Sequence, residues 1–340
     1  MRHRGMTIGL LAATVALLLF PSLAHAQGLM PIHRFYNSRS GVHFYTANEG
    51  EKQAVQTQLA STYRYEGVAY SVSATPTPYP VFRFMNVRNG VHFYTACQSE
   101  RDAVVADLLS PLQYEGIAFY IAGSVPVAPP IPAPTPVWQR FKGLKIEGVQ
   151  TSNKVIAMDF DDGPSNYKTI TEIFEKYGGK PTFFWVGNRV TTSAGQYAAA
   201  HGLEVDSHSW SHSSLSTMSD SEKLSQIDQA DARITQLVGK KPLWFRAPYN
   251  DASSSLLSLL ASRQHLYADQ YLMTRDYTGL SSSQLIQMFD TPKPGAIYLF
   301  HEGTSNTVAA LPTILANLKK KGYRVVTNTE LLRYGTPTSF

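Results

Sequence analysis

From Trp138 to the end of the chain, short apolar segments alternate with segments that have a helical pattern. Ser219 and Glu222 have the spacing of a capping box and open a helix that Gly239 can end. Repeated strand–helix units predict a parallel sheet covered by helices, and about seven units in one run favour a (β/α) barrel over an open sheet. The expected strands lie at 154–160, 182–187, 203–207, 242–246, 265–271, 295–301 and 323–327.

An acidic turn closes the first of these strands. Asp159, Asp161 and Asp162 end an apolar run, and Gly163-Pro164 then breaks the backbone. Adjacent side chains on an extended backbone point to opposite sides, so Asp161 and Asp162 are not expected to share one partner. Crowded carboxylates repel one another unless cations or hydrogen bonds compensate, which indicates a metal site or a proton-transfer role. A solvated acidic turn is the alternative.

His208 and His212 follow the third expected strand. If this segment begins a helix, the i, i+4 spacing places both imidazoles on one face, where they can bind one metal ion. Such a pair is often incidental on its own. Together with a carboxylate of the acidic turn it would leave coordination positions open for water and substrate, as in catalytic sites. Zn²⁺ is the first choice for these ligands, and Co²⁺ or another divalent ion would also fit.

Two further polar segments, RAPY at 246–249 and TRDY at 274–277, follow the fourth and fifth strands, and LFH at 299–301 ends the sixth. A rigid proline close to Arg246 can help to hold its guanidinium against a carboxylate. In a (β/α) barrel, the functional residues lie on the loops that follow the strands. Five polar strand ends in one run are more than solvated loops would explain.

In this order, the five segments DFDDGP, HSWSH, RAPY, TRDY and LFH resemble the motifs of the NodB-like polysaccharide deacetylases, carbohydrate esterase family four. The resemblance covers residues 150–332. It implies an α/β fold that is a distorted (β/α) barrel of about seven strands. It also implies a metal-dependent hydrolase that removes acetyl groups from a polysaccharide.

The resemblance implies roles for individual residues. Asp162, His208 and His212 correspond to the metal ligands of the family. Asp161 corresponds to the catalytic base that takes a proton from the attacking water. Arg246 corresponds to the residue that orients this base.

The remaining correspondences concern the leaving group and the substrate. His301 corresponds to the catalytic acid, and Asp276 to the carboxylate that holds it and raises its pKa. Tyr249 corresponds to the position whose backbone amide helps to form the oxyanion hole. Tyr277 and Leu299 correspond to the apolar lining of the acetyl pocket.

The sequence departs from the family pattern at five positions. Asp159 stands where Thr or Ser is usual, and the resemblance gives no role for this third acid. Met273 replaces an acid and Tyr277 replaces Trp, which leaves the shape of the substrate pocket in doubt. Asn250 replaces a common Gly, and Glu302 replaces a frequent Asp. None of these changes removes a metal ligand or the acid–base pair.

Residues 1–26 have the pattern of a signal peptide. Arg2 and Arg4 precede an apolar run, and Ala24-His25-Ala26 provides a cleavage site. The mature chain is therefore expected outside the cytoplasm, in the periplasm, the cell wall or the medium. No later segment is expected to span a membrane. An uncleaved N-terminal anchor is the alternative.

An internal repeat precedes the barrel. RFYNSRSGVHFYTA (34–47) recurs as RFMNVRNGVHFYTA (83–96), and YEGVAY (65–70) recurs as YEGIAF (114–119), always 49 residues later. Each copy predicts a hairpin, a helix and a returning strand. The repeated aromatics could form a sugar-stacking surface, but the core of each copy is the simpler interpretation. The copies resemble short aromatic repeats of secreted bacterial hydrolases, which implies an accessory role in wall or sugar binding.

Composition sets the expected domain boundaries. We expect a signal peptide at 1–26, a small α+β tandem-repeat module at 27–122 with copies at about 32–72 and 81–121, a Pro-rich linker at 123–137 and the catalytic domain at 138–340. The formal net charge is +5, and loss of Arg2 and Arg4 with the signal peptide lowers it by two. This excess is too small to indicate a nucleic-acid partner.

The sequence therefore predicts a secreted, metal-dependent enzyme that hydrolyses the N-acetyl group of N-acetylglucosamine residues in chitin, chitooligosaccharide or peptidoglycan. Two alternatives stay open. One is an O-deacetylase such as an acetylxylan esterase, because the same kind of site can cleave esters. The other is a non-catalytic protein that binds the wall or a carbohydrate.

Overall fold

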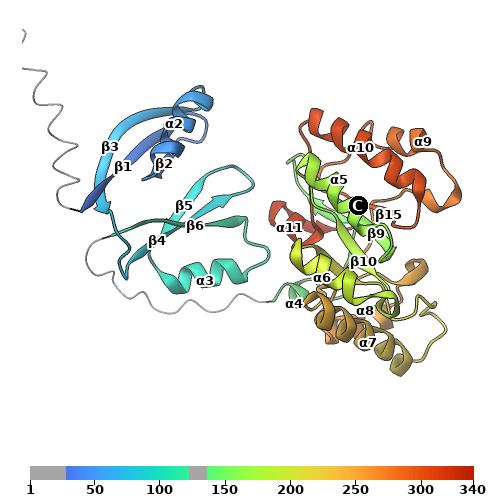
Figure 1. Cartoon of the computed structure of the whole chain (residues 1–340). Coiled ribbons are helices and arrows are strands. Elements are labelled where there is room, and N and C mark those ends of the chain that lie inside the picture. Colours follow the sequence, from blue (N-terminus) through green and yellow to red (C-terminus); the bar gives the residue numbers. More distant parts are fainter. Residues whose placement is uncertain (1–27, 122–135) are drawn as a thin grey trace, which may run out of the picture. The chain divides into compact units, whose positions relative to one another are not determined.

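The computed structural model describes residues 28–121 and 136–340, which divide into two compact units (Figure 1). The expected signal peptide and residues 123–135 of the expected linker lie outside the described residues. Helix α4 (Val137–Arg140) begins at the last residue of the expected linker. The exact domain boundaries stay a prediction. Within the two described ranges, no helix has both the length and the apolar character needed to cross a membrane.

The first unit, formed mainly by residues 28–121, is a six-stranded antiparallel sheet in the order β2-β1-β3-β6-β4-β5. Each repeat copy forms a hairpin, a helix and a returning strand, so the predicted α+β module is confirmed. The elements of copy one are β1 (Leu29–Asn37), β2 (His43–Thr46), α2 (Glu49–Gln58) and β3 (Tyr63–Ser73). Those of copy two are β4 (Pro80–Asn86), β5 (His92–Thr95), α3 (Gln98–Ala106) and β6 (Leu112–Tyr120).

The core of the first unit consists mainly of the repeated aromatic and aliphatic residues. Phe35 and the equivalent Phe84 are fully buried, and Phe44 is buried as well. The copies are joined where β3 meets β6 and by the hydroxyl of Tyr94, which donates to the carbonyl of Tyr45 at 2.8 Å and accepts from its N–H at 3.1 Å. The hydroxyl of Tyr45, the equivalent residue, makes no such bond within the described residues.

The second unit, residues 136–340, contains a curled sheet in the order β14-β15-β9-β10-β11-β12-β13-β7, in which every pair is parallel and β16 also pairs with β9. The predicted alternation of strands and helices is confirmed, with β7 and β14 as short additions. The strands are β7 (Lys145–Ile146), β9 (Val155–Gly163), β10 (Thr182–Trp185), β11 (Glu204–Ser207), β12 (Trp244–Phe245), β13 (Leu266–Ala268), β14 (Leu272–Met273), β15 (Ile297–His301) and β16 (Arg324–Val326).

Helices lie outside this sheet, and the short antiparallel pair of β8 (Gly148–Gln150) and β17 (Thr336–Thr338) completes the unit (Figure 1). The helices are α5 (Tyr167–Tyr177), α6 (Thr192–Ala200), α7 (Asp220–Val238), α8 (Ser254–Ser262), α9 (Ser282–Gln287), α10 (Ser305–Lys320) and α11 (Asn328–Leu331). The capping box of Ser219 and Glu222 opens α7, and Gly239 ends it in the left-handed conformation, as predicted.

Burial on both faces explains the apolar run at residues 155–158 of β9 and the three successive aromatic residues of β10. In β9 every residue except Asp162 is buried, and β10 is buried at all four positions. Phe160 packs against Phe174 of α5 and against the rings of Phe183 and Phe300 on the neighbouring strands. Such continuous apolar strands are typical of parallel sheets covered by helices. The parallel direction places the carboxyl ends of the strands at one edge of the sheet.

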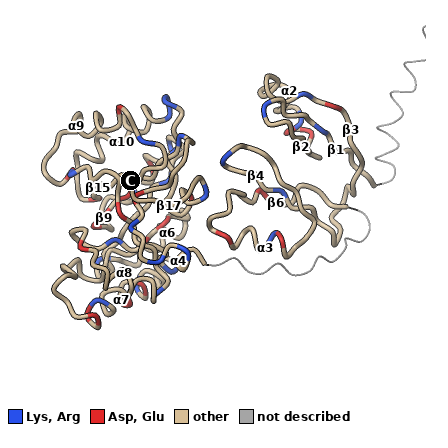
Figure 2. Tube along the Cα trace, turned by 180° about the vertical axis from the view of Figure 1, so that it is seen from behind, with Lys and Arg blue, Asp and Glu red and all other residues tan. Residues whose placement is uncertain are grey.

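Charged residues of both signs are interspersed along the two units (Figure 2).

We expect Tyr94→Phe to reduce the local stability of the first unit by about 1–2 kcal/mol, because the N–H and C=O of Tyr45 lose their partner. Hydrogen exchange of the amides in β2 and β5 measures this loss. Tyr45→Phe is the matched control at the equivalent position, and we expect a change within about 0.5 kcal/mol. Equal losses in the two variants would contradict the role of the Tyr94 hydroxyl.

Candidate metal and acid–base site

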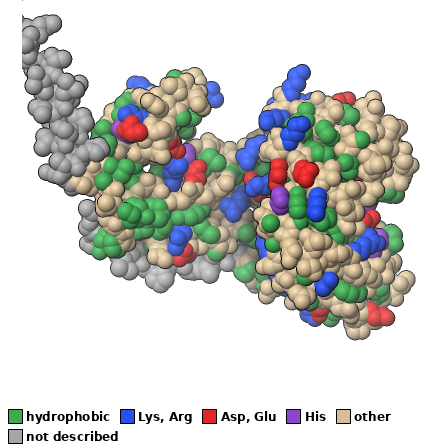
Figure 3. Space-filling model, in the orientation of Figure 1, with side chains coloured by type: hydrophobic (Ala, Val, Ile, Leu, Met, Phe, Trp, Pro, Cys, Tyr) green, Lys and Arg blue, Asp and Glu red, His purple; other side chains and the backbone are tan. Residues whose placement is uncertain are grey.

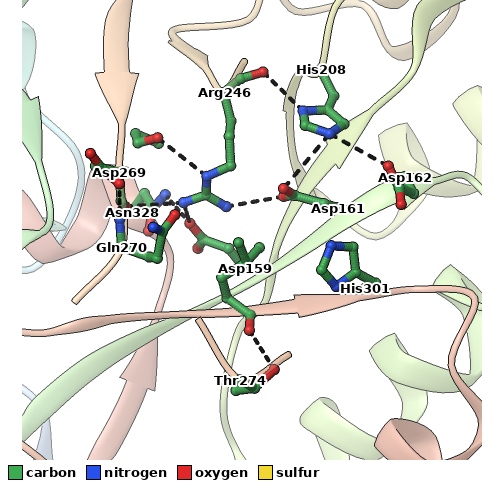
Figure 4. Close-up of polar contacts among 12 residues, drawn as sticks. Asp159, Asp161, Asp162, His208, Arg246, Asp269, Gln270, Thr274, His301 and Asn328 are labelled. Carbon is green, nitrogen blue, oxygen red and sulfur yellow. Dashed lines mark hydrogen bonds and ion pairs between the residues drawn. The ribbon is translucent and has the colours of Figure 1, made fainter. Parts of the chain in front are cut away.

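Five strands bring the predicted site residues to the carboxyl edge of the sheet. Asp161 and Asp162 end β9, and His301 ends β15 in direct register with Asp161. His208 follows β11, and Arg246 follows β12. Asp276 opens a short 3₁₀ turn, Asp276–Thr278, after β14. Residues that are up to about 140 positions apart in the sequence thus lie in one cluster (Figure 4).

The side chains of Asp162, His208 and His212 form a group in which the candidate metal-binding atoms all lie within 4.8 Å of one another. Asp162 Oδ1 is 2.8 Å from His212 Nε2 and 3.5 Å from His208 Nε2. This oxygen is buried and has no well-aligned hydrogen bond. Burial raises the pKa of Asp162, but the two imidazoles outweigh burial and hold it well below its usual range.

The tautomer of His208 fits a metal ligand. Its Nδ1 lies 2.9 Å from the backbone carbonyl oxygen of Arg246, and a carbonyl can only accept a hydrogen bond. Nδ1 therefore carries the proton, and Nε2 presents its lone pair to Asp162 and His212. Two imidazole nitrogens and one carboxylate oxygen with no other partner are a donor set that suits a divalent transition metal ion.

The segment that carries the two histidines is a loop, so the expected helical placement is wrong. Ser209 and His212 have positive φ angles of 67° and 62°, which break any helix. Gln226 of α7 holds the loop by accepting hydrogen bonds from the N–H groups of Trp210 and Ser211. The imidazoles converge because of this loop and not because of an i, i+4 spacing.

The prediction that Asp161 and Asp162 point to opposite sides of the strand is also wrong. Asp162 has a φ of 72°, so the chain leaves the extended conformation at this residue. As a result, both carboxylates approach His208 Nε2, at 3.7 Å for Asp161 and 3.5 Å for Asp162.

Arg246 is fully buried and lies between two carboxylates (Figure 4). Its Nη1 donates to Asp161 Oδ1 at 3.0 Å, and its Nη2 donates to Asp159 Oδ2 at 2.7 Å. Further donations go to the carbonyl oxygens of Ala268 and Asp269. Burial lowers the pKa of Arg246, but the charges of the two aspartates outweigh burial and raise it. Arg246 therefore fixes one oxygen of Asp161.

Asp159 is the residue that sequence reasoning left without a role. It is fully buried, and Asn328 Nδ2 donates to its Oδ2 at 2.9 Å, beside Arg246. Burial raises the pKa of Asp159 to about 7, although Arg246 and Asn328 oppose this shift. Because residues i and i+2 of a strand share a face, the spacing of Asp159 and Asp161 could have indicated one shared cation. No local signal in the sequence points to Asn328.

His301 and Asp276 form the second pair of the cluster. His301 Nδ1 lies 2.7 Å from Asp276 Oδ1, and the His301 N–H donates to Oδ2. Burial lowers the pKa of His301, but the hydrogen bond to Asp276 and the charges of Asp161, Asp276 and Asp162 outweigh it, so the net shift is upward. Burial raises the pKa of Asp276, whereas hydrogen bonds from His301 and Thr307 dominate and lower it.

Two exposed tyrosines flank the cluster. The Tyr249 ring lies 5.0 Å from the His212 ring and is 72% exposed. The Tyr277 ring lies 5.0 Å from the His301 ring and is 59% exposed. Both stand edge-on to the histidines. Leu299, by contrast, is buried within β15.

Glu302 is a buried residue that links two segments of the site, and sequence reasoning gave it no such role. Trp185 Nε1 donates to its Oε1 and the Ser165 N–H donates to its Oε2, each at 2.7 Å. Burial raises the pKa of Glu302 to about 7 despite these donors. The side chain joins the end of β15 to the loop after β9, and a Cβ at Gly163 would collide with it. Glu302 therefore holds the acidic turn in place.

Comparison with known proteins matches the two units to two different families. The family model described as polysaccharide deacetylase matches residues 148–267. A domain of unknown function, DUF5648, matches residues 19–128, so the resemblance of the repeats to an accessory binding module is not confirmed.

Among curated relatives, the peptidoglycan-N-acetylglucosamine deacetylase of Bacillus cereus is 33% identical over 196 residues, which cover 55% of this chain and 92% of the relative. The bifunctional xylanase/deacetylase of Pseudobutyrivibrio xylanivorans is 35% identical over 193 residues, 54% of this chain but only 31% of that protein. Among solved structures, a pseudoenzyme of carbohydrate esterase family 4 from Bacillus anthracis has a TM-score of 0.54 at 27% identity, covering 57% of this chain and 70% of the other.

The predicted fold class is confirmed by these neighbours. The match to nearly the whole length of the Bacillus cereus relative shows that the chain belongs to the polysaccharide deacetylase family, and the family model covers the strands that carry the candidate metal ligands and Arg246.

Proposed function

We propose that this chain is a metal-dependent deacetylase that hydrolyses the N-acetyl group of N-acetylglucosamine residues in a polysaccharide and releases acetate. One observation carries the proposal: a candidate metal site, an Asp–Arg pair and a His–Asp pair lie together at one edge of the sheet. The name of the Bacillus cereus relative supports peptidoglycan as a substrate. Chitin and chitooligosaccharides contain the same sugar and stay candidates.

Asp162, His208 and His212 would hold the divalent ion, with Zn²⁺ as the first choice and Co²⁺ or another divalent ion as alternatives. When bound there, such an ion would lower the pKa of water and polarise the acetamide carbonyl. The buried Nδ1 hydrogen bond of His208 would keep its ligand nitrogen correctly oriented.

Asp161 would act as the general base. Arg246 occupies its Oδ1, so Oδ2 is the oxygen that can accept a proton from the attacking water. The shared guanidinium also fixes the direction of this carboxylate, since Arg246 has carbonyl and carboxylate partners on several sides. Proton transfer to a correctly positioned general base typically contributes about 10²–10⁴ in rate.

His301 would act as the general acid. Its Nδ1 is engaged by Asp276, so Nε2 is free to give its proton to the amine nitrogen as the C–N bond breaks. The raised pKa of His301 favours the protonated form that this step requires. Water thus supplies a hydroxyl to the acetyl carbon, and the products are acetate and a free amino sugar.

The flanking residues would bind the substrate. The backbone amide of Tyr249 would contribute to an oxyanion hole, and Tyr277 with Leu299 would line the acetyl pocket. The exposed rings of Tyr249 and Tyr277 next to the two histidines support contact with a sugar beside the cluster.

A location outside the cytoplasm is part of the proposal. The signal-like pattern of residues 1–26 supports it, and so do relatives named as peptidoglycan deacetylases. Binding of the cell wall by the repeats would be consistent with this location, and it would raise the local concentration of the enzyme on its polymer.

Two other functions remain to be separated from this one by experiment. An O-deacetylase, such as an acetylxylan esterase, would use the same residues but release a hydroxyl in place of an amine. A non-catalytic binding protein is the second, since a fold neighbour is described as a pseudoenzyme. The complete set of Asp161, Asp162, His208, His212 and His301 in one cluster favours catalysis.

We expect the Zn²⁺-loaded chain to release acetate and free amine from an N-acetylglucosamine tetramer or from peptidoglycan, and a chelator to abolish this release. Asp161→Asn should lower kcat by about 10²–10⁴-fold because the proton acceptor is lost. Asp290→Asn, an exposed acid of the same unit, is the matched control and should retain full activity. Release of acetate from acetylxylan but not from these N-acetylated substrates would favour the O-deacetylase, and no release from any of the three by the loaded chain would favour the binding protein.

The pH dependence of kcat/KM tests whether His301 is the general acid. Because the folded-state pKa of His301 is raised, its proton is retained to higher pH and is lost only as the pH rises through that pKa. We expect Asp276→Asn to lower this pKa and to move the alkaline limb of the kcat/KM profile to lower pH. Asp290→Asn should leave the limb in place. An unchanged limb in Asp276→Asn would show that His301 does not supply the proton.

A further inference from the structure

The first unit contains one three-residue cluster in each repeat copy. In copy one, Arg34 of β1 and His43 of β2 both contact Glu66 of β3. Glu66 Oε2 lies 2.9 Å from Arg34 Nε and 3.1 Å from His43 Nε2. Arg64 also contacts Glu66, with its Nη2 at 3.0 Å from Oε1. The carboxylate therefore orients both the guanidinium and the imidazole.

In copy two, the equivalent cluster is Arg83, His92 and Glu115, with corresponding distances of 2.8 and 3.3 Å. Copy one covers this cluster. Glu51 places a carboxylate oxygen 3.0 Å from Arg83 Nη1, and the Phe44 ring lies 4.9 Å from the His92 ring. In copy two, therefore, the arginine of the Arg–His pair binds a carboxylate, and the histidine lies against an apolar ring.

The cluster of copy one has no such cover within the described residues. The side chain of Arg34 is 41% exposed and that of His43 is 37% exposed, against 18% for Arg83 and 15% for His92. Phe93 and Glu100 are the counterparts of the residues that cover copy two, but neither makes an ion pair or ring contact with Arg34 or His43. The Nη groups of Arg34 are therefore available to an incoming carboxylate.

A row of aromatic rings lies beside this exposed cluster. The Tyr36 and His43 rings are 5.6 Å apart, those of His43 and Tyr45 are 6.2 Å apart, and those of Tyr45 and Tyr70 are 6.1 Å apart. The Arg64 guanidinium lies 5.6 Å from the Tyr36 ring. Flat rings with neighbouring polar groups suit the apolar face and the hydroxyls of a pyranose sugar. Figure 3 shows histidine, basic, acidic and hydrophobic side chains side by side on this unit.

We propose that the exposed cluster of copy one, defined by Arg34, His43, Glu66 and the adjacent Tyr36 and Tyr45, binds a carboxylate-bearing pyranose residue of a polysaccharide. The carboxylate binds Arg34 as Glu51 binds Arg83, and the sugar ring takes the place that Phe44 has against His92. Two arginines, Arg34 and Arg64, pair with the single carboxylate of Glu66, so the site has a net positive charge that attracts the carboxylate of the sugar. A uronic acid and a sugar with a lactyl ether both supply this chemistry. The site is separate from the acid–base cluster and does not depend on its activity.

Binding is measured by calorimetry with the full-length chain that carries Asp161→Asn, so that no probe is consumed. The acidic probes are a uronic acid tetramer and the peptide-free disaccharide of N-acetylglucosamine and N-acetylmuramic acid, and which of them binds identifies the source of the carboxylate. Arg34→Gln should weaken binding about tenfold, as loss of one charge-assisted contact predicts. Arg83→Gln is the matched control and should leave the affinity within about twofold, because its guanidinium is already occupied.

The proposal is overturned if neither acidic probe binds, if Arg34→Gln weakens binding of the neutral N-acetylglucosamine tetramer as much as binding of the acidic probes, or if Arg34→Gln binds the acidic probes like the parent chain. Equal competition by an acidic hexapeptide would also overturn it, because a carboxylate without a sugar ring would then suffice. Thermal unfolding of each variant shows whether it is folded. Should Arg34→Gln not fold, His43→Ala replaces it and carries the same expectation.

Discussion

A single buried guanidinium connects the parts of the second unit on which the site depends. Arg246 follows β12, contacts two acids of β9 and reaches the backbone at the end of β13. A buried charge that loses its partner typically costs about 3–5 kcal/mol. The ion pairs of Arg246 with Asp159 and Asp161 are therefore expected to stabilise the fold as well as to position the base. The same arginine presents its backbone carbonyl to His208, so one residue orients both the base and a candidate metal ligand.

The rest of the site is built from the same kind of contact, in which a fixed partner occupies one atom of a functional group and leaves the other atom for chemistry. Arg246 occupies one oxygen of Asp161, and Asp276 occupies Nδ1 of His301. Glu302 holds the loop after β9 through Ser165 and Trp185. These partners are buried, whereas Tyr249 and Tyr277 beside the two histidines are exposed, so the reactive groups lie next to side chains that a polymer could contact.

Much of this arrangement could be predicted from the sequence, because strand ends in a parallel sheet must meet at one edge. The alternation of strands and helices predicted a parallel sheet with the functional residues at the carboxyl ends of its strands, and the motif residues lie there. The path of the backbone between strands could not be predicted: positive φ angles at Asp162, Ser209 and His212 place side chains where neither strand nor helix geometry would. Partners such as Asn328 and Thr307 were also missed, since nothing in their local sequence shows which strand end they face.

The central claim is that Asp162, His208 and His212 form one metal site. Equilibrium dialysis against Zn²⁺, followed by metal analysis, tests it most directly. We expect one ion per chain, loss of that ion in His212→Ala, and its retention in His301→Ala, which alters the same cluster without removing a ligand. A parent chain that binds no ion, or a His212→Ala variant that still binds one ion as tightly as the parent, would contradict a metal site at these three residues.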